Sequence, residues 1–253
     1  TSAEAIRLAG LDWEVVGQPI FTDSGINYKY VKKKGQIVIN TWHGTPLKHM
    51  GCRNIPEQAN LGIIQHSLLS SDYLIFPNEY MKDIMLDAYM IGKIYRGEML
   101  LEGYPRNSIF FDEKRKDELK SILSLEDKEI FVYMPTFKGS VNNRDDEKQN
   151  AEISKFLAEI EDSLTEDQIF FVKLHPYNQA KINFSNYKNI MAFPEGWEIY
   201  DLLNMADCLI TDYSSVFFDF ANTKRKIIIF NYDEEEYMRE RGIYFSLDEL
   251  PFP

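Results

Sequence analysis

Short apolar runs alternate along the chain with longer stretches in which apolar and polar residues recur at helical spacing. The short runs are apolar on both faces, which is typical of strands buried within a parallel sheet. Strands are expected at Ile37–Trp42, Asp72–Pro77, Glu98–Leu101, Glu129–Pro135, Gln168–His175, Asn189–Phe193, Cys208–Thr211 and Lys226–Asn231. Helices are expected at Glu57–Ser70, Glu79–Tyr89, Glu113–Leu123, Glu152–Ser163, Glu198–Met205 and Val216–Asn222. This alternation predicts an α/β protein in which helices cover mostly parallel sheets.

A domain boundary is expected near Leu101–Tyr104, because two or three strand–helix units precede it and four or five follow it. Two Rossmann-like halves would account for that number. We therefore expect residues 1–102 to form an N-terminal half and residues 103–253 to form a C-terminal half. The chain starts at Thr1 in mid-pattern and stops at Pro253 just after an apparent strand, so we expect it to be a piece of a longer protein.

Two charged stretches stand out from this pattern. The segment Asn142–Gln149 is predicted to be a polar loop, which could serve as a mobile lid. Its Asp145-Asp146 pair could mimic a metal-binding pair, but a solvated charge run is the better interpretation. The run Lys32–Lys34 is also expected to be a solvated turn.

The composition is that of a globular protein, with 44% hydrophobic and 27% charged residues. The formal net charge of −12 over 253 residues argues against nucleic-acid binding, which needs a basic face to neutralise phosphates. The two cysteines, Cys52 and Cys208, exclude a disulfide scaffold. We expect both to be reduced residues in or near the core, as suits a cytosolic protein. No apolar run reaches the roughly 18 residues that a membrane-spanning helix needs.

Residues that bind phosphate or carry protons follow several of the predicted strands. These segments are His43–Lys48, Gly103–Asn107, Pro135–Lys138, Lys173–Pro176 and Thr211–Ser215. In open α/β sheets, ligands bind beyond the carboxyl ends of the strands. The concentration of such residues there predicts a ligand site.

The two strand-end histidines are the strongest candidates for catalysis. A lone histidine in the His43-Gly44-Thr45 turn would more often be a buried, hydrogen-bonded residue. A second histidine at a strand end, His175, favours a chemical role for both. His49 and His66 are expected to be ordinary loop or helix residues.

The segment Thr211–Ser215 allows two compatible interpretations. Its hydroxyl and carboxyl side chains could cap the following helix. A helix that starts with two serines could also offer N–H groups and hydroxyls to a phosphate. Asp219, four residues after Ser215, could reach ribose or glycerol hydroxyls or could point to solvent. Arg106 could simply pair with a surface acid.

Several familiar motifs are absent from the sequence. His43, His49 and Cys52 do not have a zinc-site spacing, so a metal site is not expected. The chain has no G-x-G-x-x-G, Walker A or G-x-S-x-G pattern. Dinucleotide-binding, P-loop and α/β-hydrolase sites are therefore disfavoured.

Taken in order, these segments resemble the CDP-glycerol glycerophosphotransferase family. Its members are the teichoic-acid primases and polymerases of Gram-positive bacteria and their ribitol-phosphate and capsule relatives. The matching segments are Trp42–Lys48, Gly103–Asn107, Pro135–Lys138, Lys173–Pro176, Ile210–Phe220 and Arg239–Phe245. They cover most of the chain, and the first and the Ile210–Phe220 segments are specific in combination.

The resemblance implies a GT-B-like fold, with two Rossmann-like halves whose parallel sheets face one cleft. It implies transfer of glycerol phosphate from CDP-glycerol to a hydroxyl of a lipid-linked teichoic-acid or capsule acceptor, with release of CMP. His43 and His175 would be catalytic. The donor would be held by Gly44, Thr45, Pro46, Arg106, Pro135, Thr136, Lys173, Thr211, Ser214, Ser215 and Asp219. No cofactor is implied, although Mg²⁺ could assist. The N-terminal half is short for a complete Rossmann unit.

Chemistry assigns roles within this set. An acceptor hydroxyl is a poor nucleophile near neutral pH, so His43 would act as general base. The Ser214-Ser215 helix start would supply donors to the phosphates, and Arg106 and protonated His175 would supply positive charge.

Three alternatives remain at this point. The donor could be CDP-ribitol, or the protein could be a GT-B glycosyltransferase that uses a nucleotide sugar. A non-enzymatic nucleotide-binding or scaffold module of cell-wall assembly is a third, and the presence of both His43 and His175 argues against it. Fold alone does not separate these.

A lipid-linked acceptor implies peripheral contact with the cytoplasmic face of the membrane. Met81–Tyr95, rich in Met, Ile and Tyr, could lie on a membrane surface. Core packing of an amphipathic helix is the better interpretation of that stretch. The net charge of −12 does not favour docking on anionic lipid.

Overall fold

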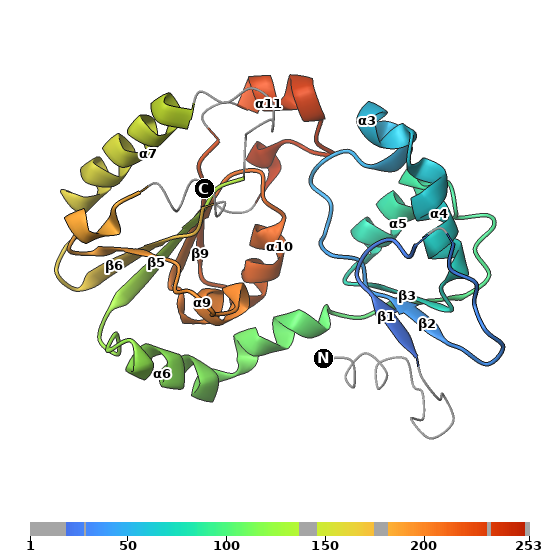
Figure 1. Cartoon of the computed structure of the whole chain (residues 1–253), viewed down its shortest axis with the longest axis horizontal. Coiled ribbons are helices and arrows are strands. Elements are labelled where there is room, and N and C mark those ends of the chain that lie inside the picture. Colours follow the sequence, from blue (N-terminus) through green and yellow to red (C-terminus); the bar gives the residue numbers. More distant parts are fainter. Residues whose placement is uncertain (1–18, 28, 137–145, 175–181, 232–233, 251–253) are drawn as a thin grey trace. The chain divides into compact units, whose positions relative to one another are not determined.

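The computed structural model describes residues 19–27, 29–136, 146–174, 182–231 and 234–250. The chain folds into two compact units, each built on its own parallel sheet (Figure 1). The first unit draws on Thr1–Ser108 and Asp233–Ser246, and the second on Ile109–Tyr232 and Leu247–Pro253. No single boundary in the sequence separates these units, because the C-terminal segment Asp233–Ser246 belongs to the first of them.

The first unit contains a four-stranded parallel sheet in the order β1-β2-β3-β4. Its strands are β1 (Ile20–Thr22), β2 (Val38–Asn40), β3 (Tyr73–Phe76) and β4 (Glu98–Leu101). Its helices are η1 (Gly51–Arg53), α3 (Ile55–Gln58), α4 (Leu61–Ser70), α5 (Glu79–Ala88) and α11 (Glu234–Arg241), and η2 (Pro105–Phe111) leads into the second unit. Asn78 begins α5 by accepting a hydrogen bond from the Met81 N–H at 2.8 Å.

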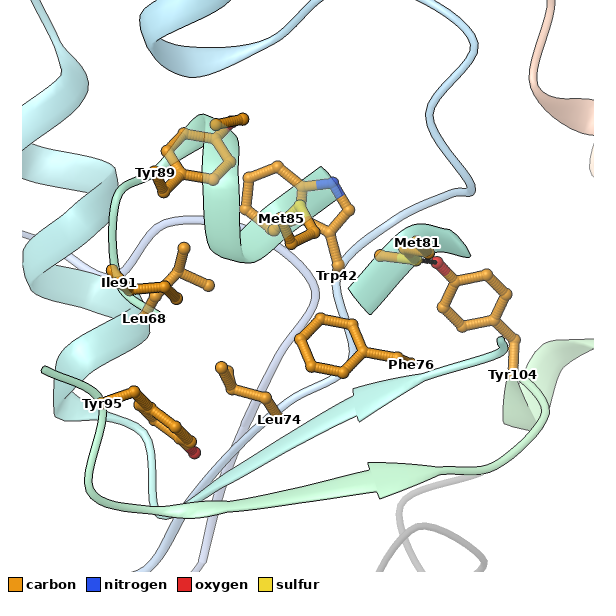
Figure 2. Close-up of a cluster of buried hydrophobic side chains, with 11 residues drawn as sticks. Trp42, Leu68, Leu74, Phe76, Met81, Met85, Tyr89, Ile91, Tyr95 and Tyr104 are labelled. Atoms are coloured by element: carbon orange, nitrogen blue, oxygen red, sulfur yellow. Dashed lines mark hydrogen bonds between the residues drawn. The ribbon is translucent and has the colours of Figure 1, made fainter. Parts of the chain in front are cut away.

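The core of the first unit lies between the sheet and helices α4 and α5. Leu74 and Phe76 point from β3 toward Met81 and Met85 of α5, and Trp42 enters from the loop after β2 (Figure 2). All five side chains are buried. The apolar face of α5 therefore belongs to the core, as expected for an amphipathic helix of a globular protein. Of the residues after it up to Tyr95, Tyr89, Ile91 and Tyr95 are also buried, and Met90 and Ile94 are exposed.

The second unit contains a five-stranded parallel sheet in the order β7-β6-β5-β8-β9. Its strands are β5 (Glu129–Met134), β6 (Gln168–Val172), β7 (Ile190–Ala192), β8 (Cys208–Thr211) and β9 (Lys226–Ile229). Its helices are α6 (Glu113–Ile122), α7 (Asp146–Glu161), η3 (Phe184–Asn186), α9 (Ile199–Met205), α10 (Val216–Phe220), η4 (Ala221–Thr223) and η5 (Leu247–Glu249). The strand order reverses between β5 and β8, the position at which doubly wound sheets bind ligands.

The predicted α/β fold with two parallel sheets is confirmed, and each predicted strand is present with a shift of a few residues at most. The strand expected at Gln168–His175 ends at Val172, and His175 lies outside the described residues. The sequence pattern missed β1, because only three residues separate Pro19 from polar Asp23. It also missed α11, whose residues carry almost no apolar stripe.

Two predictions about local structure are wrong. The helix expected at Glu57–Ser70 is divided into α3 and α4, because Asn60 leaves helical geometry at φ −105° and ψ 2° and begins α4. Much of the predicted polar loop Asn142–Gln149 is helical, since α7 starts at Asp146. Glu, Lys and Gln are good helix formers, so polarity alone did not identify a loop. Asp145 and its neighbours back to residue 137 lie outside the described residues.

Other expectations about the surface and the core are met. Lys32–Lys34 forms an exposed turn, in which Lys32 pairs with Asp72. Cys208 is buried and Cys52 is half-buried, and both are free thiols. Among the described residues, no helix has the length and apolar character needed to cross a membrane.

Candidate functional site

The loop that follows β2 is shaped by a polar residue at the strand's end. Asn40 is buried, and its Oδ1 accepts a hydrogen bond from the Trp42 N–H at 2.8 Å. Its Nδ2 donates to the Ser24 carbonyl at 3.2 Å. Trp42 takes a left-handed backbone conformation at φ 54°, which is unusual for a bulky residue. The chain therefore turns sharply between β2 and His43.

His43 projects from this turn in a defined orientation. Its ring stacks on Trp42 with centroids 4.5 Å apart and an angle of 25° between the planes. Its Nδ1 lies 2.8 Å from the carbonyl oxygen of Asp23. A carbonyl can only accept, so Nδ1 carries the proton, and a neutral ring then has its lone pair on Nε2. The side chain of His43 is hydrogen-bonded but exposed. The alternative interpretation, a buried histidine with a structural role, is therefore wrong about its burial.

The next three residues are part of the buried framework of the loop. Gly44, Thr45 and Pro46 are all buried. The Tyr80 hydroxyl donates to the Pro46 carbonyl at 2.8 Å. Burial raises the pKa of Tyr80, so this hydroxyl keeps its proton at any physiological pH. Tyr80 thereby ties helix α5 to the loop that carries His43.

Arg106 follows the end of β4, within helix η2. Its guanidinium lies over the Tyr104 ring, 4.3 Å from the centroid. Tyr104 is buried and its hydroxyl points to the Met81 sulfur (Figure 2). The aromatic platform holds Arg106 by a cation–π contact.

In the second unit, two side chains join the ends of the adjacent strands β5 and β8. The Thr211 hydroxyl donates to the Met134 carbonyl at 2.6 Å. The Asp212 Oδ1 accepts hydrogen bonds from the N–H groups of Thr136 and Tyr213, both at 2.7 Å. Asp212 is itself buried. These contacts bring Pro135 and Thr136 beside Thr211 at the point where the strand order reverses.

Thr136 has an unusual hydroxyl at this point. Its Oγ1 is inaccessible to solvent, and among the residues that the structure describes it has no hydrogen-bond partner. A buried hydroxyl without a partner is costly, and such atoms in native proteins often face a ligand, an ion or a water molecule. This unpartnered hydroxyl is independent of the sequence motif, and it bears on the expectation that Thr136 contacts a ligand.

The two serines stand at the start of helix α10. Ser215 occupies the N-cap position, but its side chain makes no capping hydrogen bond. The capping interpretation is therefore wrong for Ser215. The helix has only five residues, so its dipole is small, and Ser214 and Ser215 would act on a ligand mainly through hydroxyl and N–H groups.

Asp219 lies inside the second unit and does not point to solvent. It is 3% exposed, and its Oδ2 accepts a hydrogen bond from the Tyr200 hydroxyl at 2.6 Å. A sequence pattern placed Asp219 on the helix face below Ser215 but had no means of finding Tyr200, which comes from α9. Asp212 was also missed, although it stands between two residues that were selected.

Lys173 follows β6, and its ammonium lies 4.9 Å from the centroid of the Phe193 ring. The backbone N–H of Lys173 donates to the Tyr133 carbonyl at 2.9 Å, which continues the β5–β6 pairing. His175, two residues further, lies outside the described residues, as does Lys138. Within the described part of the chain, no three His, Cys, Asp or Glu side chains gather as metal ligands would.

The sequence is similar to a described protein family and to several named proteins. Residues 16–253 match the family model described as CDP-Glycerol:Poly(glycerophosphate) glycerophosphotransferase. A teichoic acid poly(glycerol phosphate) polymerase of Staphylococcus epidermidis is 32% identical over 246 residues, covering 88% of this chain and 32% of the relative. A teichoic acid poly(ribitol-phosphate) polymerase of Bacillus spizizenii is 34% identical over 163 residues, covering 61% of this chain and 26% of the relative.

A solved structure gives the same match in three dimensions. A histidine variant of the wall teichoic acid polymerase TagF, soaked with CDPG, superposes with a TM-score of 0.73 at 29% identity. The match covers 93% of this chain and 60% of that one. The chain thus spans less than two thirds of the length of each of these relatives.

Proposed function

The chain belongs to the CDP-glycerol:poly(glycerophosphate) glycerophosphotransferase family, and on this premise we propose that it transfers glycerol phosphate from CDP-glycerol. The acceptor is a hydroxyl of a lipid-linked teichoic-acid or capsule chain, and CMP is released. The new bond joins the acceptor oxygen to the phosphorus that bears glycerol. The bond from that phosphorus to the bridging oxygen of the diphosphate breaks, and CMP takes that oxygen.

His43 is the general base of this reaction. The observation that carries the assignment is the hydrogen bond from Nδ1 to the Asp23 carbonyl at 2.8 Å, which leaves Nε2 to accept a proton. Stacking on Trp42 fixes the plane of the ring. A positioned general base typically accelerates such a step by about 10² to 10⁴.

The second unit binds the CDP-activated donor at the strand reversal between β5 and β8. Two hydroxyl groups support this assignment: that of Thr136, which has no partner among the described residues, and that of Ser215, which makes no capping hydrogen bond. Ser214, Thr211 and Pro135 complete the set at the ends of the same two strands. Asp219 would accept from a hydroxyl of the donor, with its carboxylate oriented by Tyr200.

Positive charge for the diphosphate comes from Arg106 and from protonated His175, and Lys173 is a further donor-binding residue. Gly44, Thr45 and Pro46 support the base by their buried backbone. Charge stabilisation at the bridging oxygen lowers the barrier because CMP leaves as an anion.

A CDP-ribitol donor is the second candidate. The 34% identity to the poly(ribitol-phosphate) polymerase supports it, because the name of that relative specifies ribitol phosphate. We also propose that the protein meets its lipid-linked acceptor by peripheral contact with the cytoplasmic face of the membrane.

Calorimetric binding of CDP-glycerol, CDP-ribitol, CMP and UDP-glucose tests the donor without needing an acceptor. Preferred binding of CDP-glycerol is the expected result. Preferred binding of CDP-ribitol would mean that ribitol phosphate is transferred in the same type of reaction. Tight binding of UDP-glucose would indicate a glycosyltransferase. Binding of none of the four would contradict the proposed donor site.

A further inference from the structure

The segment Gly242–Phe245, here called the C-terminal strap, pairs with a loop almost two hundred residues earlier in the sequence. Lys48 and Ile243 form an antiparallel bridge. The His49 N–H donates to the Gly242 carbonyl at 3.1 Å, and the Tyr244 N–H donates to the Leu47 carbonyl at 2.9 Å. The strap therefore adds a short antiparallel pairing to the loop Thr41–Met50, here called the histidine loop, which carries His43.

The strap needs a glycine at its first position. Gly242 ends helix α11 at φ +67°, a left-handed conformation that favours glycine. A Cβ atom at Gly242 would lie 2.4 Å from Nδ1 of His49. The His49 ring also meets Tyr244 edge-on, with centroids 4.8 Å apart. The strap and the histidine loop thus fit together only without a side chain at residue 242.

Two tyrosines extend this contact along the histidine loop. The Tyr244 hydroxyl oxygen accepts a hydrogen bond from the Met50 N–H at 3.2 Å. The Phe245 ring packs edge-on against Tyr80, with centroids 5.8 Å apart, and Tyr80 donates to the Pro46 carbonyl. The carbonyl groups of Pro46 and Leu47 are therefore both held through the strap.

The histidine loop is fixed at both ends by these contacts. Asn40 and Asp23 hold it at Trp42 and His43, before the buried Gly44–Pro46 stretch. The strap holds it at Leu47 and beyond. Because the loop between these ends is short and buried, a shift of Leu47 must be passed to His43.

We propose that Gly242 and Tyr244 are positioning residues that set the orientation of His43 through the histidine loop. The proposal rests on the proposed function insofar as His43 is the base. The strap acts on the loop, not on substrate, so its loss lowers kcat far more than it changes KM for the donor. A displacement of a catalytic group by about 1 Å can cost up to about 100-fold in rate.

The first test observes His43 directly, without any substrate. Protein labelled with ¹⁵N-histidine contains four histidines, and the His43 signals are assigned by their loss in His43→Ala. Wild-type His43 should show the Nδ1–H tautomer. Gly242→Ala should shift its ring nitrogens toward a mixture of tautomers, and unchanged His43 signals in a folded Gly242→Ala protein would overturn the proposal.

The second test measures kcat and KM for the donor. Gly242→Ala should lower kcat by about 10-fold or more at nearly constant KM. Tyr244→Phe keeps the ring and removes only the hydrogen bond to the Met50 N–H, so kcat should decrease by a few fold. This variant provides the test if Gly242→Ala fails to fold. Met238→Ala, on the exposed side of α11, is the matched control.

A double mutant separates positioning from simple damage. His49→Ala removes the ring that an alanine at position 242 would strike, so it should restore much of the kcat lost in Gly242→Ala. Equal losses of kcat in Met238→Ala and Gly242→Ala would overturn the proposal. If wild-type protein transfers no glycerol phosphate, the proposed function fails, while the ¹⁵N signals still decide the role of the strap.

Discussion

The Asp212 carboxylate joins the ends of two adjacent parallel strands by accepting the N–H of Thr136 at 2.7 Å, across 76 residues of sequence. The same oxygen accepts the N–H of Tyr213. The buried carboxylate therefore defines where the segments after β5 and β8 begin, and both segments carry proposed donor-binding residues.

Replacing Asp212 by alanine should weaken both folding and donor binding. The buried Tyr213 N–H and the partly buried Thr136 N–H lose their acceptor, which costs about 1–3 kcal/mol for each N–H that no water reaches. Urea unfolding should show the loss of stability, and calorimetry should show a higher Kd for CDP-glycerol. Asp207→Ala is the control, because the Asp207 carboxylate accepts the Ile130 N–H at the opposite end of β5. It should lower stability and leave Kd unchanged; an equal effect on Kd would contradict the role of Asp212.

Removal of the His43 imidazole should abolish most turnover and leave donor affinity nearly intact. The expected decrease in kcat for His43→Ala is about 10² to 10⁴, the usual contribution of a general base. Release of CMP in the presence of an acceptor provides the measurement. His66→Ala, at an exposed position of α4, is the control. Full turnover in His43→Ala would exclude His43 as the base.

Loss of the Ser214 hydroxyl should act on binding. A hydrogen bond to a charged phosphate contributes about 1.5–3 kcal/mol, so Ser214→Ala should raise the Kd of CDP-glycerol by about 10-fold or more. Ser163→Ala is a suitable control, because its hydroxyl donates to a carbonyl near the end of α7. An unchanged Kd with reduced kcat would place Ser214 in the chemical step instead of in donor binding.

Cys208 should contribute to the alkaline loss of stability. Burial raises the pKa of its thiol from 9.0 to about 11. Below pH 9 the thiol is protonated whether the chain is folded or not, so its contribution is constant there. As the pH rises from 9 toward 11, the unfolded chain loses this proton first, and the stability of the folded state falls.

The comparison of wild type with Cys208→Ala isolates this contribution. Two pKa units correspond to ~3 kcal/mol at most. Urea unfolding at pH 8, 9, 10 and 11 should show that wild-type stability falls more steeply than that of Cys208→Ala. Parallel curves for the two proteins would mean that the thiol does not titrate differently on folding.

Much of the candidate site was accessible from the sequence because its residues follow strands. An apolar run such as Cys208–Thr211 predicts a buried strand, and the polar residues after it then lie beyond the carboxyl end of that strand. Thr136, Thr211, Ser214 and Ser215 were selected as candidates in this way, although nothing in the local pattern revealed their partners.

The residues that orient the site were mostly missed, because their contacts come from segments distant in the sequence. Tyr200 reaches Asp219 from another helix, and the acceptor for His43 is the backbone carbonyl of Asp23. A carbonyl has the same identity in every residue, so no sequence pattern marks the one that a histidine will use. Only Asn40 carried a signal, as a polar residue at the end of an apolar run.

By itself the sequence determined the alternation of strands and helices, the parallel character of the sheets and the strand ends that carry reactive side chains. These features depend on local burial, which repeats with the period of each element. The tertiary structure alone decided that β8 lies beside β5, that α11 and the C-terminal strap belong with the first unit, and that His43 is held in one tautomer. Strand pairing and backbone hydrogen bonds between distant segments depend on which surfaces meet after folding, and the hydrophobic pattern of a segment does not specify its neighbour.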